Sequence, residues 1–211
     1  MVKNMKNTQS PKDLIDFICC KVIKKNITDQ EKRILLVFFE CFYDFSEDPI
    51  EPPSSMVALL TTSCGMKYPQ VLSNAINCFG EKHFCFEDMA VAILKDFEGY
   101  KIFPGFGHPK YKKTDPRTEI CISAIELEGY NGEQTNKVIN ISKNINLALN
   151  IGGLFTAFLL DLGFSIKNIS YFPIIARLIG ITNIYQESEN IKFDNSYDTI
   201  RKFNHSDHNR F

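Results

Sequence analysis

Apolar residues recur along this chain at intervals of three and four positions, and no segment alternates apolar with polar residues over several positions. Intervals of three and four are typical of helices that bury one face, whereas strict alternation is typical of strands. A first helix is predicted from Ser10-Pro11 to about Lys25, and the capping box Thr28-x-x-Glu31 predicts a second helix that ends near Phe42. The pattern therefore predicts an all-α protein.

Glycine, proline and acidic residues interrupt this periodicity and mark the expected helix ends. The acidic, proline-rich stretch from Ser46 to Pro53 predicts a loop. A second irregular segment runs from Gly99 to Pro116, and irregular segments of that length in compact domains are more often functional than idle. Further helices are expected at about 54–64, 69–79, 83–97, 117–127, 133–147, 152–162 and 171–185, the third beginning at His83 or a near neighbour.

The composition supplies enough apolar material for the core of one large domain or two small ones, since 44% of the 211 residues are hydrophobic and 18 are Phe. The charges are interspersed and sum to -1, which gives no indication of a nucleic-acid or membrane partner. The first ten residues lack the apolar stretch of a secretory signal, and Asp161 and Arg177 interrupt the most apolar segments, 151–164 and 169–184. A soluble, cytoplasmic protein is therefore expected.

Seven cysteines fall mostly at apolar helical positions, and none is spaced with a histidine as in a zinc site. Reduced core residues of a cytosolic protein are the expectation for them. His205 and His208 lie in a polar tail and are expected to be solvated, not ligands. The predicted organisation is an N-terminal helix in residues 1–27, a helical domain in 28–187 and a polar C-terminal tail in 188–211.

The segment from Pro104 to Arg117 concentrates the chemistry of the chain. His108 lies in a loop whose prolines restrict the backbone and whose glycines let backbone amides approach a ligand closely. The arginine that follows can bind a carboxylate through two hydrogen bonds. A bare Gly-x-Gly is equally typical of a turn, and a Walker-type phosphate loop is excluded because His108-Pro109 follows Gly107. We expect His108 and Arg117 to converge on one anionic ligand in a cavity walled by helices.

At its full length, Gly105-Phe106-Gly107-His108, followed after six residues by Asp115-Pro116-Arg117, resembles the signature of the citrate synthase and citryl-CoA lyase family. Three flanking segments resemble the family in the same order, and the similarity extends from about Thr28 to about Tyr185. These segments are 54–58 through 77–83, similar to the helices before the first catalytic histidine, 150–164, similar to the Asn-Val-Asp-Gly segment, and 173–180, similar to the late arginine helix.

The resemblance implies an all-α, citrate synthase-like helical bundle with a small-domain-like subregion, assembled as a homodimer and closest to the short citryl-CoA lyase-like members. The implied activity is that of an acyltransferase or lyase, which makes or breaks a carbon–carbon bond between the α-carbon of an acyl-CoA and the carbonyl of a keto acid. The implied ligands are an acyl-CoA and a di- or tricarboxylic acid. Coenzyme A thioester is then a substrate, and no cofactor is bound permanently.

The resemblance also implies roles for individual residues. His83 matches the catalytic histidine that donates to the thioester carbonyl, and His108 matches the one facing the keto acid or the hydroxyl carbon of citrate. Arg117 and Arg177 match arginines that bind substrate carboxylates, together with the loop Gly105-Phe106-Gly107. If His83 lies at a helix N-terminus, the helix dipole would disfavour the imidazolium and keep a neutral donor.

Other readings of these residues stay open. His83 could be structural, and each arginine could form a surface ion pair. Arg201 could match a late arginine that some members lend across the dimer.

The chain departs from the family at three places: Gly152 stands where the family has its catalytic aspartate, His83-Phe84-Cys85-Phe86 replaces His-Gly-Gly-Ala, and Tyr43-Asp44-Phe45 replaces an Asp-His-Gly-like turn. Loss of a general base typically costs about 10²- to 10⁴-fold in rate. Bulky residues in the second motif could also fill the space that admits the acyl-CoA.

Other acidic residues lie near these positions. Asp161 is expected to be a helix-end residue, whereas Glu81, Glu87 or Asp88 could supply a relocated base. The first hypothesis is accordingly a citrate synthase or citryl-CoA lyase-like enzyme. The alternatives are a catalytically impaired pseudoenzyme, which binds a carboxylate or serves as a partner subunit, and a helical scaffold without a ligand.

Overall fold

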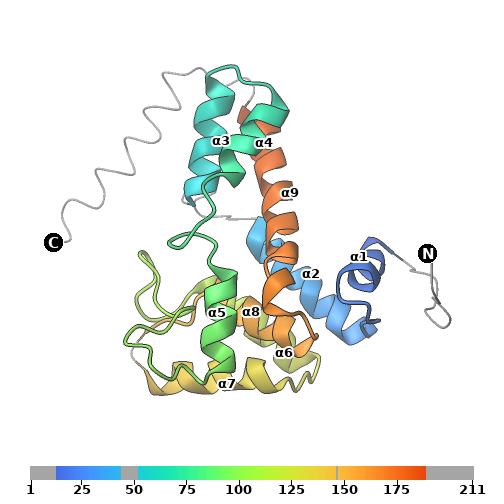
Figure 1. Cartoon of the computed structure of the whole chain (residues 1–211), viewed down its shortest axis with the longest axis vertical. Coiled ribbons are helices and arrows are strands. Elements are labelled where there is room, and N and C mark those ends of the chain that lie inside the picture. The colour runs from blue at the N-terminus through green and yellow to red at the C-terminus, as the bar shows by residue number, and fades with distance from the viewer. Residues whose placement is uncertain (1–12, 44–51, 146, 189–211) are drawn as a thin grey trace. The chain divides into compact units, whose positions relative to one another are not determined.

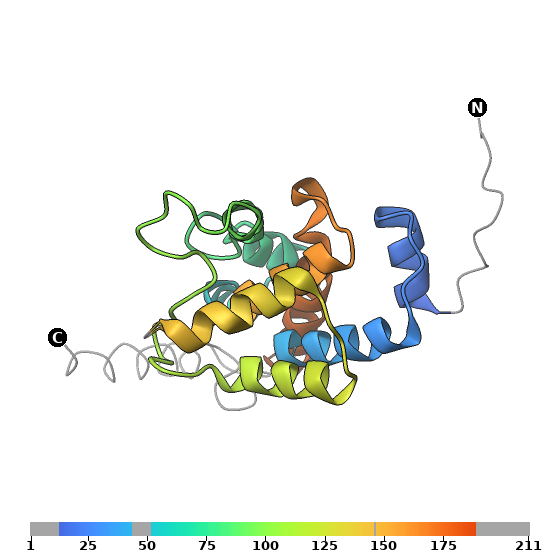
Figure 2. The same ribbon diagram turned by 90° about the horizontal axis from the view of Figure 1, so that it is seen from below.

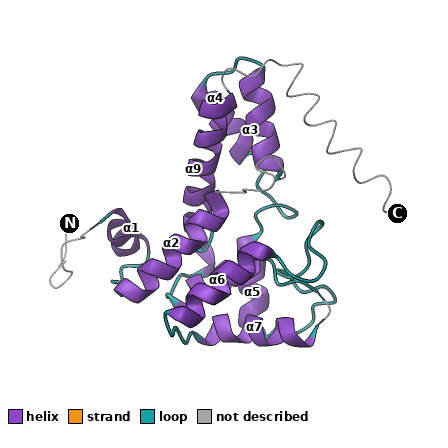
Figure 3. Cartoon of the chain, turned by 180° about the vertical axis from the view of Figure 1, so that it is seen from behind, coloured by secondary structure: helices purple, strands orange, loops and turns teal. Residues whose placement is uncertain are grey.

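The computed structural model describes residues 13–43, 52–145 and 147–188, and in these ranges the chain is helical, without a strand (Figures 1 and 3). The all-α class predicted from the periodicity is confirmed. The helices are α1 (Leu14–Val22), α2 (Asp29–Tyr43), α3 (Pro53–Ser63), α4 (Tyr68–Ile76), α5 (Phe86–Leu94), α6 (Pro116–Leu127), α7 (Glu133–Asn144), α8 (Ile151–Asp161) and α9 (Tyr171–Ser188), with a short 3-10 helix at Ile166–Asn168.

The first two helices begin at side-chain caps. Asp13 caps α1, because its Oδ1 atom accepts a hydrogen bond from the backbone N–H of Asp16 at 2.8 Å. The helix therefore starts later than the predicted Ser10-Pro11, a pair that lies outside the described residues. The predicted capping box of α2 is confirmed, since Glu31 accepts from the Thr28 N–H at 2.7 Å while the Thr28 hydroxyl accepts from the Glu31 N–H at 3.1 Å.

Two compact units make up the fold. Unit 1 comprises Met1–Cys41 and Phe86–Tyr171, and unit 2 comprises Phe42–Cys85 and Phe172–Phe211. Each unit is thus built from two separate stretches of chain.

The core of unit 1 forms around α8, the most apolar helix. Residues 151–159 are all buried, and Phe38 of α2 stacks on Phe155 at 4.5 Å and on Phe158 at 5.3 Å between ring centroids. Helices α5, α6 and α7 also pack against α8. The segment between α5 and α6 runs as a long loop, as predicted from its lack of periodicity (Figure 2).

The core of unit 2 forms where α3, α4 and α9 meet. Ala58, Val71, Ala75 and Ile181 are fully buried there. The hydroxyl groups of Tyr68 and Thr182 share a hydrogen bond of 2.7 Å, which ties α4 to α9. The small side chains of Ala58 and Ala75 allow the helices to approach closely.

The helix predicted to begin at His83 or a near neighbour begins at Phe86, three residues after His83. His83 lies instead in a tight turn, in which its backbone N–H and C=O both bond to Gly80, at 3.0 and 2.7 Å. Phe84 follows with φ of 74°, a left-handed conformation that does not continue into a helix.

Candidate functional site

The loop that carries His108 is held against the start of α8 by backbone contacts. Gly105 C=O accepts from Asn150 N–H at 3.0 Å, and the side-chain amide of Asn150 donates to Gly107 C=O at 3.0 Å. The approach is so close that a Cβ atom on Gly153 would lie 2.8 Å from Gly105 Cα. Gly105 and Gly107 also have φ of 90° and 82°. These glycines are therefore required by geometry.

Phe106 anchors this loop in the core. It is 7% exposed and packs edge-to-face on Phe97 at 5.6 Å and on Phe103 at 6.0 Å between ring centroids. The buried Phe106 side chain thus holds the loop against the core, and the backbone that follows it positions His108.

The protonation state of His108 follows from its neighbours. Its Nδ1 atom accepts hydrogen bonds from the backbone N–H groups of Lys110 at 3.2 Å and Tyr111 at 3.3 Å. A neutral imidazole that accepts at Nδ1 carries its proton on Nε2. The ring also stacks on Tyr111 at 4.7 Å between centroids. His108 is therefore oriented as a neutral Nε2–H donor.

Arg117 is held by the buried carboxylate of Asp115. The two Asp115 oxygens accept from Arg117 Nε at 2.9 Å and from Nη2 at 2.8 Å, and Oδ1 also accepts from the Arg117 backbone N–H at 3.1 Å. Asp115 caps α6 in this way, and its Oδ2 atom reaches the N–H of Ile151 at the start of α8, at 3.3 Å. One fully buried carboxylate thus fixes two helix ends and the guanidinium.

Asp115 was part of the sequence motif, but sequence reasoning gave it no role. The signal for that role was present, because an aspartate before a proline is typical of an N-cap followed by the first helical residue. What the sequence does not reveal is the second helix that the same carboxylate reaches.

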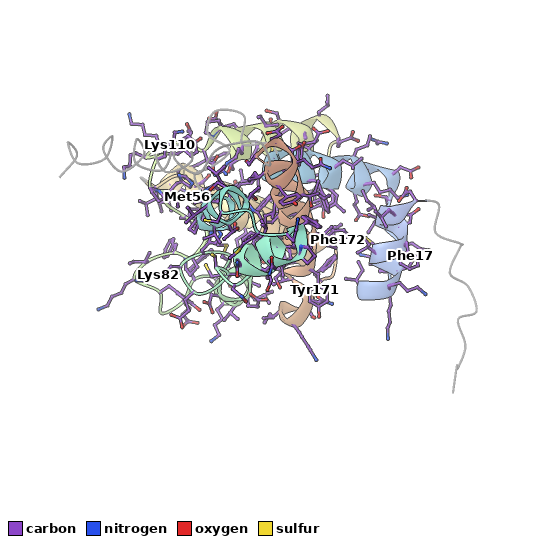
Figure 4. All side chains as sticks on the ribbon, turned by 90° about the horizontal axis from the view of Figure 1, so that it is seen from above. Phe17, Met56, Lys82, Lys110, Tyr171 and Phe172 are labelled. Atoms are coloured by element: carbon purple, nitrogen blue, oxygen red, sulfur yellow. The ribbon has the colours of Figure 1, made fainter. Side chains whose placement is uncertain are left out.

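The structure brings His108 and Arg117 together, with 3.4 Å between His108 Nε2 and Arg117 Nη2. Both nitrogens are donors, because Nε2 bears the proton and a guanidinium has no acceptor. The pKa of His108 is lowered, first by burial and then by Arg117; Asp115 opposes this, and Lys110 (Figure 4) and Lys112 lower it further. Two donors in a positively charged environment suit an anionic oxygen as their common acceptor.

The second predicted histidine, His83, lies in unit 2 beside α3. Its Nε2 atom is 3.1 Å from the hydroxyl oxygen of Ser54, which is fully buried. The pKa of His83 is lowered to about 4, first by burial and then by the charge of Arg177. The ring is thus neutral near pH 7, but the helix dipole is not the cause, since no helix begins at His83. Lys82, the residue before it, is exposed and points outward (Figure 4).

Arg177 is buried, so the alternative of a surface ion pair is wrong. The residue is 4% exposed, and its Nη1 atom donates to the Ser55 hydroxyl at 3.3 Å. Its guanidinium carbon lies 6.0 Å from the ring centroid of Phe42 and 5.9 Å from that of Phe84. Sequence reasoning missed Ser54 and Ser55 as partners of His83 and Arg177, because hydroxyl residues in the first turn of a helix are common.

The bulky motif after His83 fills the space beside these residues. Phe84 stacks on Phe79 with 4.1 Å between ring centroids, contacts Phe42 edge-to-face at 6.4 Å and lies 5.6 Å from the His83 ring. Aromatic rings in unit 2 thus occupy the volume that smaller residues would leave open.

The position of the family aspartate is also filled. A Cβ atom on Gly152 would lie 3.3 Å from Met89 Cε and 3.5 Å from Met89 Sδ, so the methionine of α5 occupies the space beside it. The hydroxyl of Thr156 bonds to Gly152 C=O at 2.7 Å. No carboxylate stands at this point of α8.

Asp161 is a helix-end residue, as predicted. It is the last residue of α8, and its two oxygens accept from the backbone N–H groups of Gln134 and Thr135, each at 2.8 Å. It therefore caps the N-terminus of α7. The other candidates for a relocated base, Glu81, Glu87 and Asp88, are all exposed, and Arg201, Asp44 and Phe45 lie outside the described residues.

The described part of the chain contains no cluster of three or more histidine, cysteine or acidic side chains that could hold a metal ion. No helix among the described residues is both long and apolar enough to cross a membrane. All seven cysteines lie in described ranges and are free thiols, of which Cys19, Cys20, Cys41 and Cys121 are buried.

Comparison with known proteins gives structural but not sequence matches. No family profile and no curated protein matches the chain. Among solved structures, the citryl-CoA lyase from Hydrogenobacter thermophilus is similar with a TM-score of 0.68 and 23% identity, over 86% of this chain and 78% of that one.

Two ATP citrate lyases are similar with a TM-score of 0.71 and 16% identity over 86% of this chain. One is from Methanosaeta concilii in complex with (3S)-citryl-CoA, and the other is from Methanothrix soehngenii in complex with citrate and coenzyme A. This chain spans 35% of their length. The helices described above therefore have the fold of citryl-CoA lyase.

Proposed function

We propose that this chain is a citryl-CoA lyase-like protein that binds an acyl-CoA and a di- or tricarboxylate and makes or cleaves the carbon–carbon bond between them. The observation that carries the proposal is the pair of donors, His108 Nε2–H and Arg117 Nη2–H, 3.4 Å apart. A carboxylate or hydroxyl oxygen placed beside both nitrogens would satisfy them together. The citryl-CoA lyase fold and the ligands of the two ATP citrate lyases support the same chemistry.

Each residue has a part in this proposal. Arg117, already oriented by Asp115, binds a carboxylate of the substrate, and His108 donates to the oxygen on the carbon that gains or loses the bond. Neutral His83 donates to the thioester oxygen, where negative charge develops. Arg177 binds a further carboxylate, and the helical domain of residues 28–187 forms a cytoplasmic homodimer.

Citrate binding tests the carboxylate half of the proposal. In calorimetry, Arg117→Lys should weaken citrate binding by about 10- to 100-fold, because lysine keeps the charge but cannot form the paired hydrogen bonds. His108→Ala should weaken it as well. Arg33→Lys is the matched control, since Arg33 forms a two-point ion pair with Glu128 on the surface of the same unit and should leave binding unchanged.

Turnover tests the chemical half. Purified protein is assayed with acetyl-CoA and oxaloacetate, and separately with citryl-CoA. Product in either assay that falls with His108→Ala supports the proposal. Absence of turnover in both assays would reject it as an enzyme.

A second candidate, a carboxylate-binding pseudoenzyme, is favoured by the two filled positions. Met89 occupies the space beside Gly152, and Phe84 stacks on Phe79 next to His83. Binding of citrate without binding of any CoA ester would support this candidate, as a sensor or a partner subunit. If neither citrate nor a CoA ester shifts the melting temperature, only the hypothesis of a helical scaffold without a ligand remains.

A further inference from the structure

Cys41 and Cys121 form a pair of neighbouring thiols inside unit 1. Cys41 lies in the last turn of α2 and Cys121 in α6, 80 positions later in the chain, yet their Sγ atoms are 3.7 Å apart. Both are buried, at 7% and 0% exposure. The fold alone therefore brings two sulfurs from distant segments into contact.

The two thiols are chemically unequal. The Cys121 thiol donates a hydrogen bond to Cys41 Sγ, which lowers the pKa of Cys41 against the effect of burial, and the charge of Arg117 lowers it further. The same hydrogen bond and burial raise the pKa of Cys121. Cys41 is thus the thiol that forms a thiolate more readily, and the thiolate is the form that reacts with an oxidant.

We propose that Cys41 and Cys121 form a reversible disulfide when the protein meets a peroxide, joining α2 to α6. The Cys41 thiolate attacks a peroxide oxygen and becomes a sulfenic acid, with release of one water from hydrogen peroxide. Cys121 then attacks that sulfur, and a second water leaves. Two thiols lose two electrons and two protons in all, and one hydrogen peroxide is reduced to two waters.

The movement that this step requires is small. A disulfide is about 2.05 Å long, so the sulfurs must approach by roughly 1.6 Å from their separation of 3.7 Å.

The disulfide would act on the anion-binding residues through α6. Cys121 lies one turn after Arg117, and the Cys41 thiol donates to the Arg117 backbone C=O at 3.7 Å. Drawing Cys121 toward α2 would shift the first turn of α6 and with it the guanidinium. This consequence rests on the proposed function, whereas the disulfide itself does not.

Peptide mapping tests the disulfide without any ligand. The full-length protein is treated with hydrogen peroxide, its remaining thiols are blocked, and it is digested with trypsin without reductant. The expected product joins peptide 34–67, which contains Cys41 and Cys64, to peptide 118–137, whose one cysteine is Cys121. A mass two hydrogens below the sum of the two peptides, and loss of the product on reduction, identify the bond.

Single variants assign the partner. Cys64→Ser, a change at an exposed thiol in the same peptide, should leave the joined peptides intact, whereas Cys41→Ser should abolish them. Cys121→Ser should also abolish them, and because the mapping of the wild-type protein needs no variant, a variant that fails to fold does not decide the result. Oxidation of other cysteines without any Cys41–Cys121 bond would overturn the proposal.

Citrate binding of the oxidised protein provides the functional readout. Affinity should fall at least several-fold on oxidation, recover with reductant and be insensitive to peroxide in Cys121→Ser. If the bond forms and citrate binds equally well in both states, the coupling to Arg117 is rejected. If the reduced protein binds no citrate, the proposed function fails while the mapped disulfide stands.

Discussion

At the scale of single residues, buried polar groups hold the candidate functional side chains of each unit. Asp115 accepts four hydrogen bonds, from three nitrogens of Arg117 and the N–H of Ile151. A buried carboxylate is tolerated only when it is paired in this manner. Ser54 has a related role beside His83, whose ring it contacts from the first turn of α3. The roles proposed for His108 and His83 therefore depend on residues that need not touch a ligand.

Two adjacent glycines of α8 should differ in how much stability the protein loses when each is replaced by alanine. A Cβ atom on Gly153 would meet the backbone of Gly105, which cannot move without disturbing the His108 loop, so Gly153→Ala should destabilise the protein by about 2 kcal/mol or more. A Cβ atom on Gly152 would lie 3.3 Å from both Asn150 Oδ1 and Met89 Cε, side-chain atoms that need to move by only a few tenths of an ångström. Because alanine also favours the helix, Gly152→Ala should stay within about 1 kcal/mol of wild type. Urea unfolding of both variants measures the difference, and equal costs would contradict the close approach.

His83 should make stability depend on pH in the acidic range. Its folded pKa of about 4 is below the value near 6.5 of an unfolded chain, so the unfolded state binds the proton more readily. The stability that the neutral His83 ring contributes to the fold is present above pH 6.5 and is lost as the pH falls from there toward 4. After allowance for partial exposure, the loss between pH 7 and pH 5 is about 1–2 kcal/mol.

The matched variant for this prediction is His83→Gln, which keeps a polar side chain but does not titrate. Urea unfolding at pH 7 and pH 5 should show that the variant loses less unfolding free energy between these pH values than the wild-type protein does. If the two proteins lose the same amount of stability, the ring of His83 is not held neutral by its surroundings in the folded protein.

At the scale of helices and turns, local sequence predicts most of the structure because helix signals are local. The capping box at Thr28 and the apolar segment around Phe155 predict α2 and α8 correctly. The start of α5 could not be predicted in the same manner. The reciprocal bonds of His83 with Gly80 and the left-handed Phe84 delay the helix to Phe86, and neither leaves a periodic signal.

The junction of α8 with α7 depends on one carboxylate. Asp161 accepts from two backbone N–H groups at the start of α7, and Asp161→Ala would leave both without this acceptor. The variant should lose about 1–2 kcal/mol of unfolding free energy, the usual cost of a lost helix cap. Glu126→Ala, an exposed change in the same unit, should stay within about 0.5 kcal/mol of wild type. Similar losses in both variants would show that Asp161 acts only through its charge.

At the scale of the whole molecule, the sequence indicates candidate functional residues but not what surrounds them. The loop at His108 and its link to Arg117 could be predicted, because both lie within one short motif. Occupation of the space beside Gly152 could not, since Met89 comes from a helix more than sixty positions earlier. The stacking of Phe79 on Phe84 could not be predicted either, because it results from packing and leaves no pattern in the sequence.

The discontinuous construction of unit 1 predicts how the molecule depends on its N-terminal helices. The fragment 86–171 contains α5 to α8 but lacks α2, whose Phe38 ring is fully buried and stacks on Phe155 and Phe158. Loss of one such ring typically costs about 3–5 kcal/mol, a large part of the stability of a small domain. The isolated fragment should therefore show helical circular dichroism without a cooperative thermal transition. Adding a peptide of residues 13–43 should restore the transition, whereas the same peptide with Phe38→Ala should not, and cooperative unfolding of the fragment alone would contradict this dependence.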